Sequence, residues 1–188
     1  MENNKNSKSA GRKILESKIY PLVFLVIIVL ISVSLIMVIG NITQAKIAQQ
    51  RDAEILKQLN IIFPEMTDFK YLDKYYEIYA GNDIAGFAFT LKGKGYGGDI
   101  NMLAGIDSNY NVKAISILSN TETPGLGTKI AESSFTDQFK GLGQQDVGLT
   151  IDGGKIDAIT GATISSKAVA DALRGQMEEI IEVIKNSN

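Results

Sequence analysis

The sequence predicts an α+β protein in which one N-terminal transmembrane helix is followed by a compact antiparallel-sheet domain with a long C-terminal helix. Residues 19–45 contain no charged side chain. Short strand-like stretches separated by turn residues then follow between residues 75 and 118. The last segment repeats apolar residues at steps of three and four, as in an amphipathic helix. Strands grouped ahead of one long helix favour helices packed on one side of an antiparallel sheet.

The charge-free segment is long enough to cross a bilayer. Tyr20–Ile39 is almost entirely apolar, and a helix needs about 20 such residues to span the hydrocarbon layer. Ser32 and Ser34 are tolerable there because their hydroxyls can bond back to the helix backbone. The alternative is a cleaved signal peptide, but the apolar part of such peptides is shorter, about 7–15 residues. We therefore expect a retained transmembrane helix over residues 19–40.

The N-terminal flank of that helix is basic. Residues 1–18 carry five basic and two acidic side chains, a balance of +3, while the whole chain carries −2, which leaves −5 for the rest. The positive-inside rule then predicts a single-pass protein of the cell membrane, with a cytoplasmic N-terminus and an extracytoplasmic C-terminal domain. The acidic remainder offers no basic face, so nucleic-acid binding is excluded.

Beyond the bilayer we expect a helical connector over residues 41–62 and a folded domain over residues 63–188. Phe63-Pro64 ends the connector because proline cannot continue a helix. The expected elements of the domain are a hairpin of strands 75–80 and 84–91 around Gly81-Asn82-Asp83, a second hairpin of strands 100–106 and 112–118 around Asp107-Ser108-Asn109, a helical segment over 129–135, a short strand over 148–151, and a closing helix over 166–185.

Cysteine and histidine are both absent. Their absence excludes disulfides, iron–sulfur ligation by thiolates, c-type haem attachment and the usual zinc sites, so no metal site is expected. It also excludes the Cys and His nucleophiles and bases of hydrolytic triads. A redox function would therefore need an organic cofactor.

One polar loop precedes the closing helix. Its residues are Asp157-Ala158-Ile159-Thr160-Gly161-Ala162-Thr163-Ile164-Ser165-Ser166. Thr163, Ser165 and Ser166 are candidate N-caps, and Gly161 permits close approach of the backbone. A helix N-terminus presents free N–H groups and a positive dipole end, which suit a phosphate. Local chemistry leaves a capping loop and a phosphate site both open, and capping loops are the commoner of the two.

Two further segments are rich in turn residues. The first is Glu122-Thr123-Pro124-Gly125-Leu126-Gly127, which predicts a stiff turn with accessible backbone donors, suited to packing beside a planar ring. An ordinary Pro-Gly turn is the alternative. The second is Lys94-Gly95-Tyr96-Gly97-Gly98, in which Tyr96 can stack on a ring or pack beneath it.

These segments together resemble a known family, the FMN-binding subunits of ion-translocating oxidoreductases. Asp157-x-x-Thr160-Gly161-Ala162-Thr163 resembles the flavinylation motif of that family, and Thr123–Gly127 resembles the segment that lines its flavin site. The family includes the G subunit of the Rnf complex and the related C subunit of the Na⁺-translocating NADH:quinone oxidoreductase. The short chain favours the G subunit.

The resemblance implies a covalent cofactor. In this family a flavin transferase moves FMN from FAD onto the last threonine of the motif and leaves a phosphodiester there. Carried over, Thr163 is the attachment point and Asp157 is the acidic residue that the transferase requires. Thr160, Gly161 and Ala162 form the recognition core, and the cofactor-lining residues are Tyr96 and the six residues Glu122, Thr123, Pro124, Gly125, Leu126 and Gly127.

The resemblance also implies a function as an electron-relay subunit, with no catalysis by this chain alone. The subunit would pass electrons between an iron–sulfur centre and another flavin subunit of a membrane-bound Rnf-type ferredoxin:NAD⁺ oxidoreductase coupled to Na⁺ or H⁺ translocation. Its partners would be the other membrane and flavin subunits, the flavin transferase during maturation, and the lipid bilayer. The alternatives are a stand-alone membrane-anchored FMN-domain reductase, a subunit of a Na⁺-pumping NADH:quinone oxidoreductase, and a non-redox scaffold tethered to the membrane.

Overall fold

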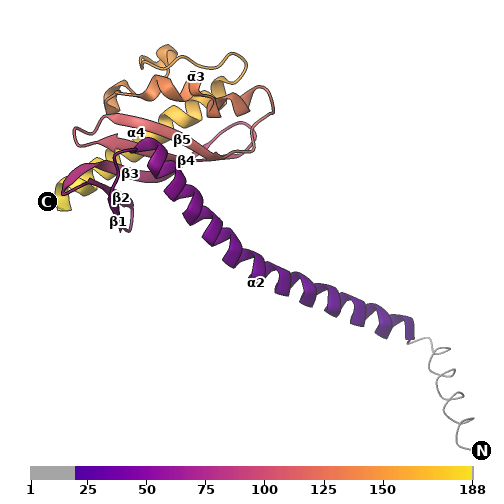
Figure 1. The fold of residues 1–188 in the computed structure, drawn as a ribbon. Coiled ribbons are helices and arrows are strands. Elements are labelled where there is room, and N and C mark those ends of the chain that lie inside the picture. The colour runs from indigo at the N-terminus through magenta and orange to yellow at the C-terminus, as the bar shows by residue number, and fades with distance from the viewer. Residues whose placement is uncertain (1–19, 188) are drawn as a thin grey trace, which may run out of the picture. The chain divides into compact units, whose positions relative to one another are not determined.

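The computed structural model describes residues 20–187 (Figure 1). The basic segment 1–18, which underlies the predicted orientation, lies outside the described residues. The chain divides into two compact units, Met1–Arg51 and Asp52–Asn188. An apolar N-terminal helix, an antiparallel sheet and a long C-terminal helix follow one another along the chain, so the predicted fold class is confirmed.

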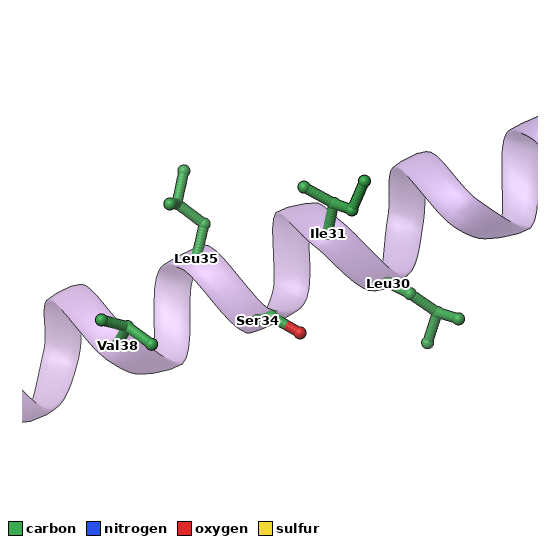
Figure 2. Close-up of a pocket in the computed structure, with 5 residues that line it drawn as sticks. All are labelled: Leu30, Ile31, Ser34, Leu35 and Val38. Carbon is green, nitrogen blue, oxygen red and sulfur yellow. The ribbon is translucent and has the colours of Figure 1, made fainter.

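Helix α2, Tyr20–Ile62, is the first described element. Its segment Pro21–Val38 has a mean hydropathy of 3.1, and its side chains are exposed. Length and composition therefore allow this segment to cross a membrane, as predicted. The Ser32 hydroxyl donates to the Ile28 carbonyl at 2.8 Å, which satisfies it within the helix. Figure 2 shows the hydroxyl of Ser34 together with the aliphatic side chains of Leu30, Ile31, Leu35 and Val38.

The unit Asp52–Asn188 is built on a five-stranded antiparallel sheet in the order β1-β2-β3-β4-β5. Both predicted hairpins are present. Gly81, with a φ of +67°, lies in the turn between β2 and β3. The Asp107 carboxylate accepts hydrogen bonds from the N–H groups of Asn109 and Asn111 at 2.8 and 2.9 Å, which shapes the turn between β4 and β5. The strands are β1 (Asp68–Leu72), β2 (Tyr75–Ala80), β3 (Asp83–Lys94), β4 (Asp99–Asp107) and β5 (Val112–Ser119).

Each face of the sheet has its own hydrophobic core, because successive side chains of a strand point to opposite faces. On one face Phe87 and Phe89 of β3 pack in the core that includes the apolar side of helix α4, Thr163–Ser187. On the other face Ala88 of β3 and Leu103 of β4 pack with the final turns of α2. Figure 1 shows α4, in yellow, running along the sheet. The sheet is therefore covered on both faces.

Two glycines let helices approach the sheet closely. A Cβ atom on Gly93 of β3 would lie 2.7 Å from the Ala168 carbonyl oxygen of α4. A Cβ atom on Gly105 of β4 would lie 2.7 Å from the ring of Phe63, just after α2. Real Cβ atoms essentially never lie within 3.0 Å of another heavy atom. The backbone contact at Gly93 therefore requires glycine, whereas a side chain at Gly105 would require Ile62 and Phe63 to move. The Gly93 contact fixes where the first turns of α4 lie on the sheet.

The segment between β5 and α4 consists of short helical turns that cover the α4 side of the fold (Figure 1). Buried Ile130, Phe135 and Phe139 anchor it in the core shared with α4. The predicted helical segment over 129–135 is a 3₁₀ turn followed by a short α turn. The elements are η1 (Gly127–Ala131), α3 (Ser133–Thr136), η2 (Asp137–Phe139), η3 (Gln144–Asp146) and η4 (Thr150–Asp152).

The prediction of a strand over residues 148–151 is wrong. Leu149 forms one isolated parallel bridge with Ile156, and Thr150–Asp152 turns into the 3₁₀ helix η4. Gly153, with a φ of +87°, ends that turn. A left-handed residue so close to the bridge prevents a longer strand from forming.

The start of the closing helix and the edge strand also differ from the prediction. Helix α4 begins at Thr163 and not at Ser166. The Ala162 carbonyl accepts the Ser166 N–H at 2.9 Å, which closes the first turn. Strand β1 was not predicted, because its mostly exposed residues show little apolar alternation.

Candidate functional site

Three segments distant in the sequence meet beside the start of α4. They are the glycine-rich turn 95–98 between β3 and β4, the segment 121–127 after β5, and the segment 157–166, which comprises the loop before α4 and the first turn of α4. Hydrogen bonds join the second segment to each of the others. The sequence singled out all three segments, and the structure brings them together.

Glu122 lies at the centre of this meeting point and is only 5% exposed. Its Oε1 atom accepts a hydrogen bond from the Gly97 N–H at 3.0 Å. Its Oε2 atom accepts a hydrogen bond from the Ser165 hydroxyl at 2.5 Å. Its own N–H donates to the Asn120 Oδ1 atom at 3.1 Å. Both carboxylate oxygens therefore have a partner, as a buried polar group requires.

Glycines surround the Glu122 side chain and leave room for it. A Cβ atom on Gly127 would lie 2.6 Å from Glu122 Oε2 and 3.0 Å from the Ser165 hydroxyl oxygen. A Cβ atom on Gly95 would lie 2.9 Å from the Glu122 carboxylate carbon. The carboxylate thus occupies space that any side chain at Gly95 or Gly127 would need.

Residues Thr123–Leu126 form the predicted tight turn. The Leu126 N–H donates to the Thr123 carbonyl at 3.2 Å, and Gly125 has a φ of +75°. Proline at the second position and a left-handed glycine at the third are typical of a type II turn. The Gly125 N–H donates to the Thr128 hydroxyl at 3.0 Å. The N–H groups of Gly125 and Leu126 are therefore bonded within residues 123–128, so neither is one of the accessible backbone donors expected of the segment Glu122–Gly127.

The turn at Thr160 and Gly161 lies against this segment. Gly161 has a φ of +80°, and a Cβ atom there would lie 3.3 Å from Cδ2 of Leu126. The Ala162 N–H donates to the Ile159 carbonyl at 2.9 Å, and Ala162 is buried. A glycine is favoured at Gly161 because the left-handed conformation strains other residues. The loop thus turns sharply just before α4 begins.

Thr163 is the first residue of α4 and is exposed. Lys167 lies one helical turn later, on the same side of the helix. Lys167 forms ion pairs with Asp152 and Asp171. The hydrogen bond to Asp152, and then the charge of Asp171, raise the pKa of Lys167. Lys167 is therefore a charged side chain that two carboxylates pair, one helical turn after Thr163.

Three large apolar side chains are exposed on the segments that meet here. Tyr96 is 74% exposed, Leu126 is 45% exposed and Ile164 is 57% exposed. One comes from each of the three segments. Each of the three segments therefore presents one large apolar side chain to solvent.

The contacts of Asp157 are with Thr150 and Gln138 and do not involve Glu122. Its carboxylate accepts a hydrogen bond from the Thr150 hydroxyl at 3.1 Å. The Gln138 side chain binds the Asp157 backbone twice, accepting from its N–H at 2.7 Å and donating to its carbonyl at 3.4 Å. Asp157 is exposed, so its carboxylate is accessible from solvent at one end of the loop.

The two serines of the loop have roles that differ from the predicted capping. Ser165 donates to Glu122. Ser166 accepts from the Ile159 N–H at 3.1 Å and donates to the Ala162 carbonyl at 3.0 Å, which ties the loop to the first turn of α4. Sequence reasoning missed the contact of Ser165 with Glu122, because 43 residues separate the partners.

Comparisons with known proteins identify the family. The FMN-binding domain family matches residues 95–177, a range that includes all three segments of the site. The G subunit of the ion-translocating oxidoreductase complex of Methanosarcina acetivorans is 30% identical over 173 residues, which cover 85% of this chain and 92% of that protein. This chain belongs to the family of G subunits of ion-translocating oxidoreductase complexes. The family predicted from the motifs is therefore confirmed.

Two other proteins are also similar to this chain. The G subunit of the proton-translocating ferredoxin:NAD⁺ oxidoreductase complex of Clostridium ljungdahlii is 35% identical over 109 residues, or 56% of this chain and 59% of that protein. The C subunit of the Na⁺-translocating NADH-quinone reductase of Parabacteroides distasonis, a crystal structure, has a TM-score of 0.45 and 25% identity over 55% of this chain and 59% of that one.

Proposed function

We propose that this member of the G-subunit family carries FMN covalently on Thr163 and relays electrons in a membrane-bound Rnf-type ferredoxin:NAD⁺ oxidoreductase coupled to Na⁺ or H⁺ translocation. The position of Thr163 carries the proposal. Its side chain is exposed at the first residue of the 25-residue helix α4, within the residues that match the FMN-binding domain family.

The surroundings of Thr163 fit a phosphodiester. The first N–H groups of a helix have no partners inside the helix, and the helix dipole places positive charge at this end. An anion attached to the first residue is therefore stabilised. Lys167 lies one turn away, but Asp152 and Asp171 pair its charge, so the helix N-terminus carries this argument.

The three exposed apolar side chains fit a flavin ring. Tyr96 and Leu126 lie on the two segments that Glu122 and Gly161 join to the α4 start, and Ile164 directly follows Thr163. An isoalloxazine ring is planar and has an apolar dimethylbenzene end, so stacking on exposed aromatic and aliphatic groups removes apolar surface from water. We propose that Tyr96 and the segment Thr123–Gly127 line the cofactor, and that Glu122 supports this lining without contacting the ring, because both of its carboxylate oxygens are bonded inside the protein.

Attachment of FMN follows from the chemistry of FAD. A bond forms between the Thr163 hydroxyl oxygen and the phosphorus of the FMN half, and the pyrophosphate bond of FAD breaks. AMP leaves, and the hydroxyl proton passes to the transferase or to solvent. We propose that the transferase reads the exposed loop in front of α4, with Asp157 as its required acidic residue and Thr160, Gly161 and Ala162 as its recognition core.

Bound FMN supplies redox chemistry with one or two electrons at a time, and the protein fixes the position and surroundings of the cofactor. The chain contains no cysteine and no histidine. Membership of the G-subunit family supports the proposal that electrons arrive from an iron–sulfur centre in a partner subunit and leave to another flavin subunit. Co-purification with membrane subunits separates this relay from a reductase that acts alone.

We further propose that the domain over residues 63–188 lies on the extracytoplasmic face. The transmembrane helix is assigned to residues 19–40 and the connector to residues 41–62, with the basic tail 1–18 in the cytoplasm. A covalent bond retains the cofactor in a compartment where a loosely held flavin would be lost. The same bond requires a flavin transferase on that face during maturation.

In-gel fluorescence tests the attachment point. After co-expression with a flavin transferase, the wild-type band should fluoresce on a denaturing gel and the Thr163→Ala band should be dark. Thr163→Ser keeps a hydroxyl and should retain at least part of the signal. Thr90→Ala removes an exposed threonine on β3 and should leave the signal unchanged. A bright Thr163→Ala band would overturn the proposal.

A further inference from the structure

We propose that Glu122 is the positioning residue of this site, a buried carboxylate that orients the first turn of α4 so that Thr163 faces outward. What Thr163 then receives rests on the proposed function. The orientation itself is a property of the chain before any flavin is attached. This role differs from that of a residue that lines the flavin.

The two oxygens of Glu122 bind two separate segments. Oε1 accepts from the Gly97 N–H in the β3–β4 turn at 3.0 Å. Oε2 accepts from the Ser165 hydroxyl in the first turn of α4 at 2.5 Å. One side chain therefore joins a sheet turn to the start of a helix. Breaking either bond leaves a buried acceptor unsatisfied, which is costly.

The surrounding backbone keeps Glu122 away from ligands. The residue is 5% exposed, and Cβ atoms on Gly95 or Gly127 would overlap its carboxylate. With both oxygens bonded inside the protein, its carboxylate has little surface left for a flavin ring. The close packing instead holds the carboxylate rigidly, so that its two bonds define a direction.

Helix geometry converts the Ser165 bond into the orientation of Thr163. Two residues along an α-helix differ in direction by about 200°, so a side chain fixed inward at Ser165 places Thr163 on the opposite side. The exposure of the two side chains agrees with these opposite directions, because Ser165 is 2% exposed and Thr163 is exposed. If the Ser165 bond were lost, the first turn could rotate or fray and the hydroxyl would lose its fixed direction.

The test compares variants of the full chain, purified in detergent from cells that lack a flavin transferase. Hydrogen exchange measures the order of segments 95–98 and 163–166 before any cofactor is bound. Purified flavin transferase and FAD are then added, and the rate at which FMN is transferred to the protein is measured. Glu122→Ala should speed exchange in both segments and slow transfer by about tenfold or more.

Glu122→Gln is the conservative variant. Its amide oxygen can accept from Gly97 while its amide N–H donates to the Ser165 oxygen, so exchange and transfer should stay much closer to wild type than in Glu122→Ala. Ser165→Ala removes only one bond. It should speed exchange mainly in segment 163–166 and slow transfer to an intermediate degree. This variant carries the test if Glu122→Ala does not fold.

Ile184→Ala is the control for general destabilisation. Ile184 is buried near the far end of α4, so its truncation lowers the melting temperature without touching the site. Its rate of transfer should match wild type at a temperature where the protein is folded. Equal slowing in this control, or wild-type exchange and transfer in Ser165→Ala, would overturn the positioning role.

Failure of the proposed function gives a different result. If wild-type protein takes up no FMN on Thr163 while Glu122→Ala still loosens both segments, the positioning role stands and the proposed function falls. If wild-type protein is labelled on Thr163 and Glu122→Ala shows unchanged exchange and transfer, the positioning role falls and the proposed function stands.

Discussion

A residue that accepts a bulky group must be exposed and must also point in a fixed direction. Thr163 is exposed at the start of a helix, and the next residues of that helix are tied to buried groups. Ser165 bonds to Glu122 and Ser166 bonds to Ala162. The backbone that carries the exposed Thr163 side chain is therefore fixed by these hydrogen bonds. Such preorganisation lowers the cost of presenting the hydroxyl to a transferase.

Gly127 should be intolerant of even a methyl group. Gly127→Ala would place a Cβ atom 2.6 Å from Glu122 Oε2 and 2.8 Å from Glu122 Cβ. We expect this overpacking to lower the free energy of unfolding by about 1–3 kcal/mol. Gly175→Ala is the matched control, because a Cβ atom there meets nothing within 4 Å. The control should raise stability by about 0.5–1 kcal/mol, since alanine favours a helix interior. Urea denaturation measures the free energy of unfolding of both variants. Equal stability of the two variants would contradict the close packing of Gly127 against Glu122.

The sequence could single out Thr163 as a candidate because its motif is contiguous and lies before an amphipathic segment. It could not identify Gln138 or Thr150. Their bonds to Asp157 span 19 and 7 residues and depend on turns that have no sequence pattern. Glu122 was found only as part of a motif, and its bonds to Gly97 and Ser165 required the structure.

At the scale of elements, α4 connects the site to the rest of the sheet. Its first turns cross β3 at Gly93, where the Ala168 carbonyl leaves no room for a side chain. Further along the helix, Glu179 bonds to Lys74 in the β1–β2 turn at 2.7 Å. The helix is therefore fixed to the sheet both near the site and near its other end.

The stabilisation contributed by the Lys74–Glu179 ion pair should be lost at both low and high pH. The hydrogen bond to Lys74 lowers the pKa of Glu179, and the hydrogen bond to Glu179 raises the pKa of Lys74. The stabilisation by Glu179 is therefore present above its unfolded pKa and lost as the pH falls through its lowered folded pKa. The stabilisation by Lys74 is present below its unfolded pKa and lost as the pH rises through its raised folded pKa.

A titration followed by NMR tests this pair. Lys74→Met should move the pKa of Glu179 upward, toward its ordinary value, while both partners' exposure keeps the effect on global stability small. Lys92→Met is the control, because Lys92 pairs with Asp99 and not with Glu179. An unchanged Glu179 titration in Lys74→Met would contradict the assigned bond.

Sequence patterns predicted the elements in which apolar residues recur at a regular spacing. The alternation in β2 to β5 and the apolar steps in α4 follow from burial of one face, which sequence records directly. Strand β1 lies at the sheet edge and has mostly exposed residues, so no such period appears. The segment between β5 and α4 is held by single buried side chains such as Phe135 and Phe139, which leave no periodic signal.

At the scale of the whole molecule, an apolar helix and a folded FMN-binding family domain share one chain. Membership of the G-subunit family and the apolar segment Pro21–Val38 together indicate membrane association. The proposed partners and the proposed orientation both involve that tether. A tether to the membrane raises the effective concentration of the domain near membrane-bound partners.

Fusion reporters test the orientation. Alkaline phosphatase fused after residue 188 should be active, and green fluorescent protein at the same position should be dark, since the former matures only outside the cytoplasm. Replacing the basic residues of the tail 1–18 with glutamine should weaken this preference, because it removes the positive-inside signal. A bright fluorescent fusion to the wild-type chain would place the domain in the cytoplasm and contradict the proposal.

Peptide mass mapping of the protein isolated from its native membrane tests the central claim most directly. We expect the peptide containing Thr163 to be heavier by one FMN less one water, with fragment masses that locate the addition on Thr163. All other peptides should have their unmodified masses. An unmodified Thr163 peptide from membranes in which the flavin transferase is active, or FMN found on another residue, would contradict covalent attachment at Thr163.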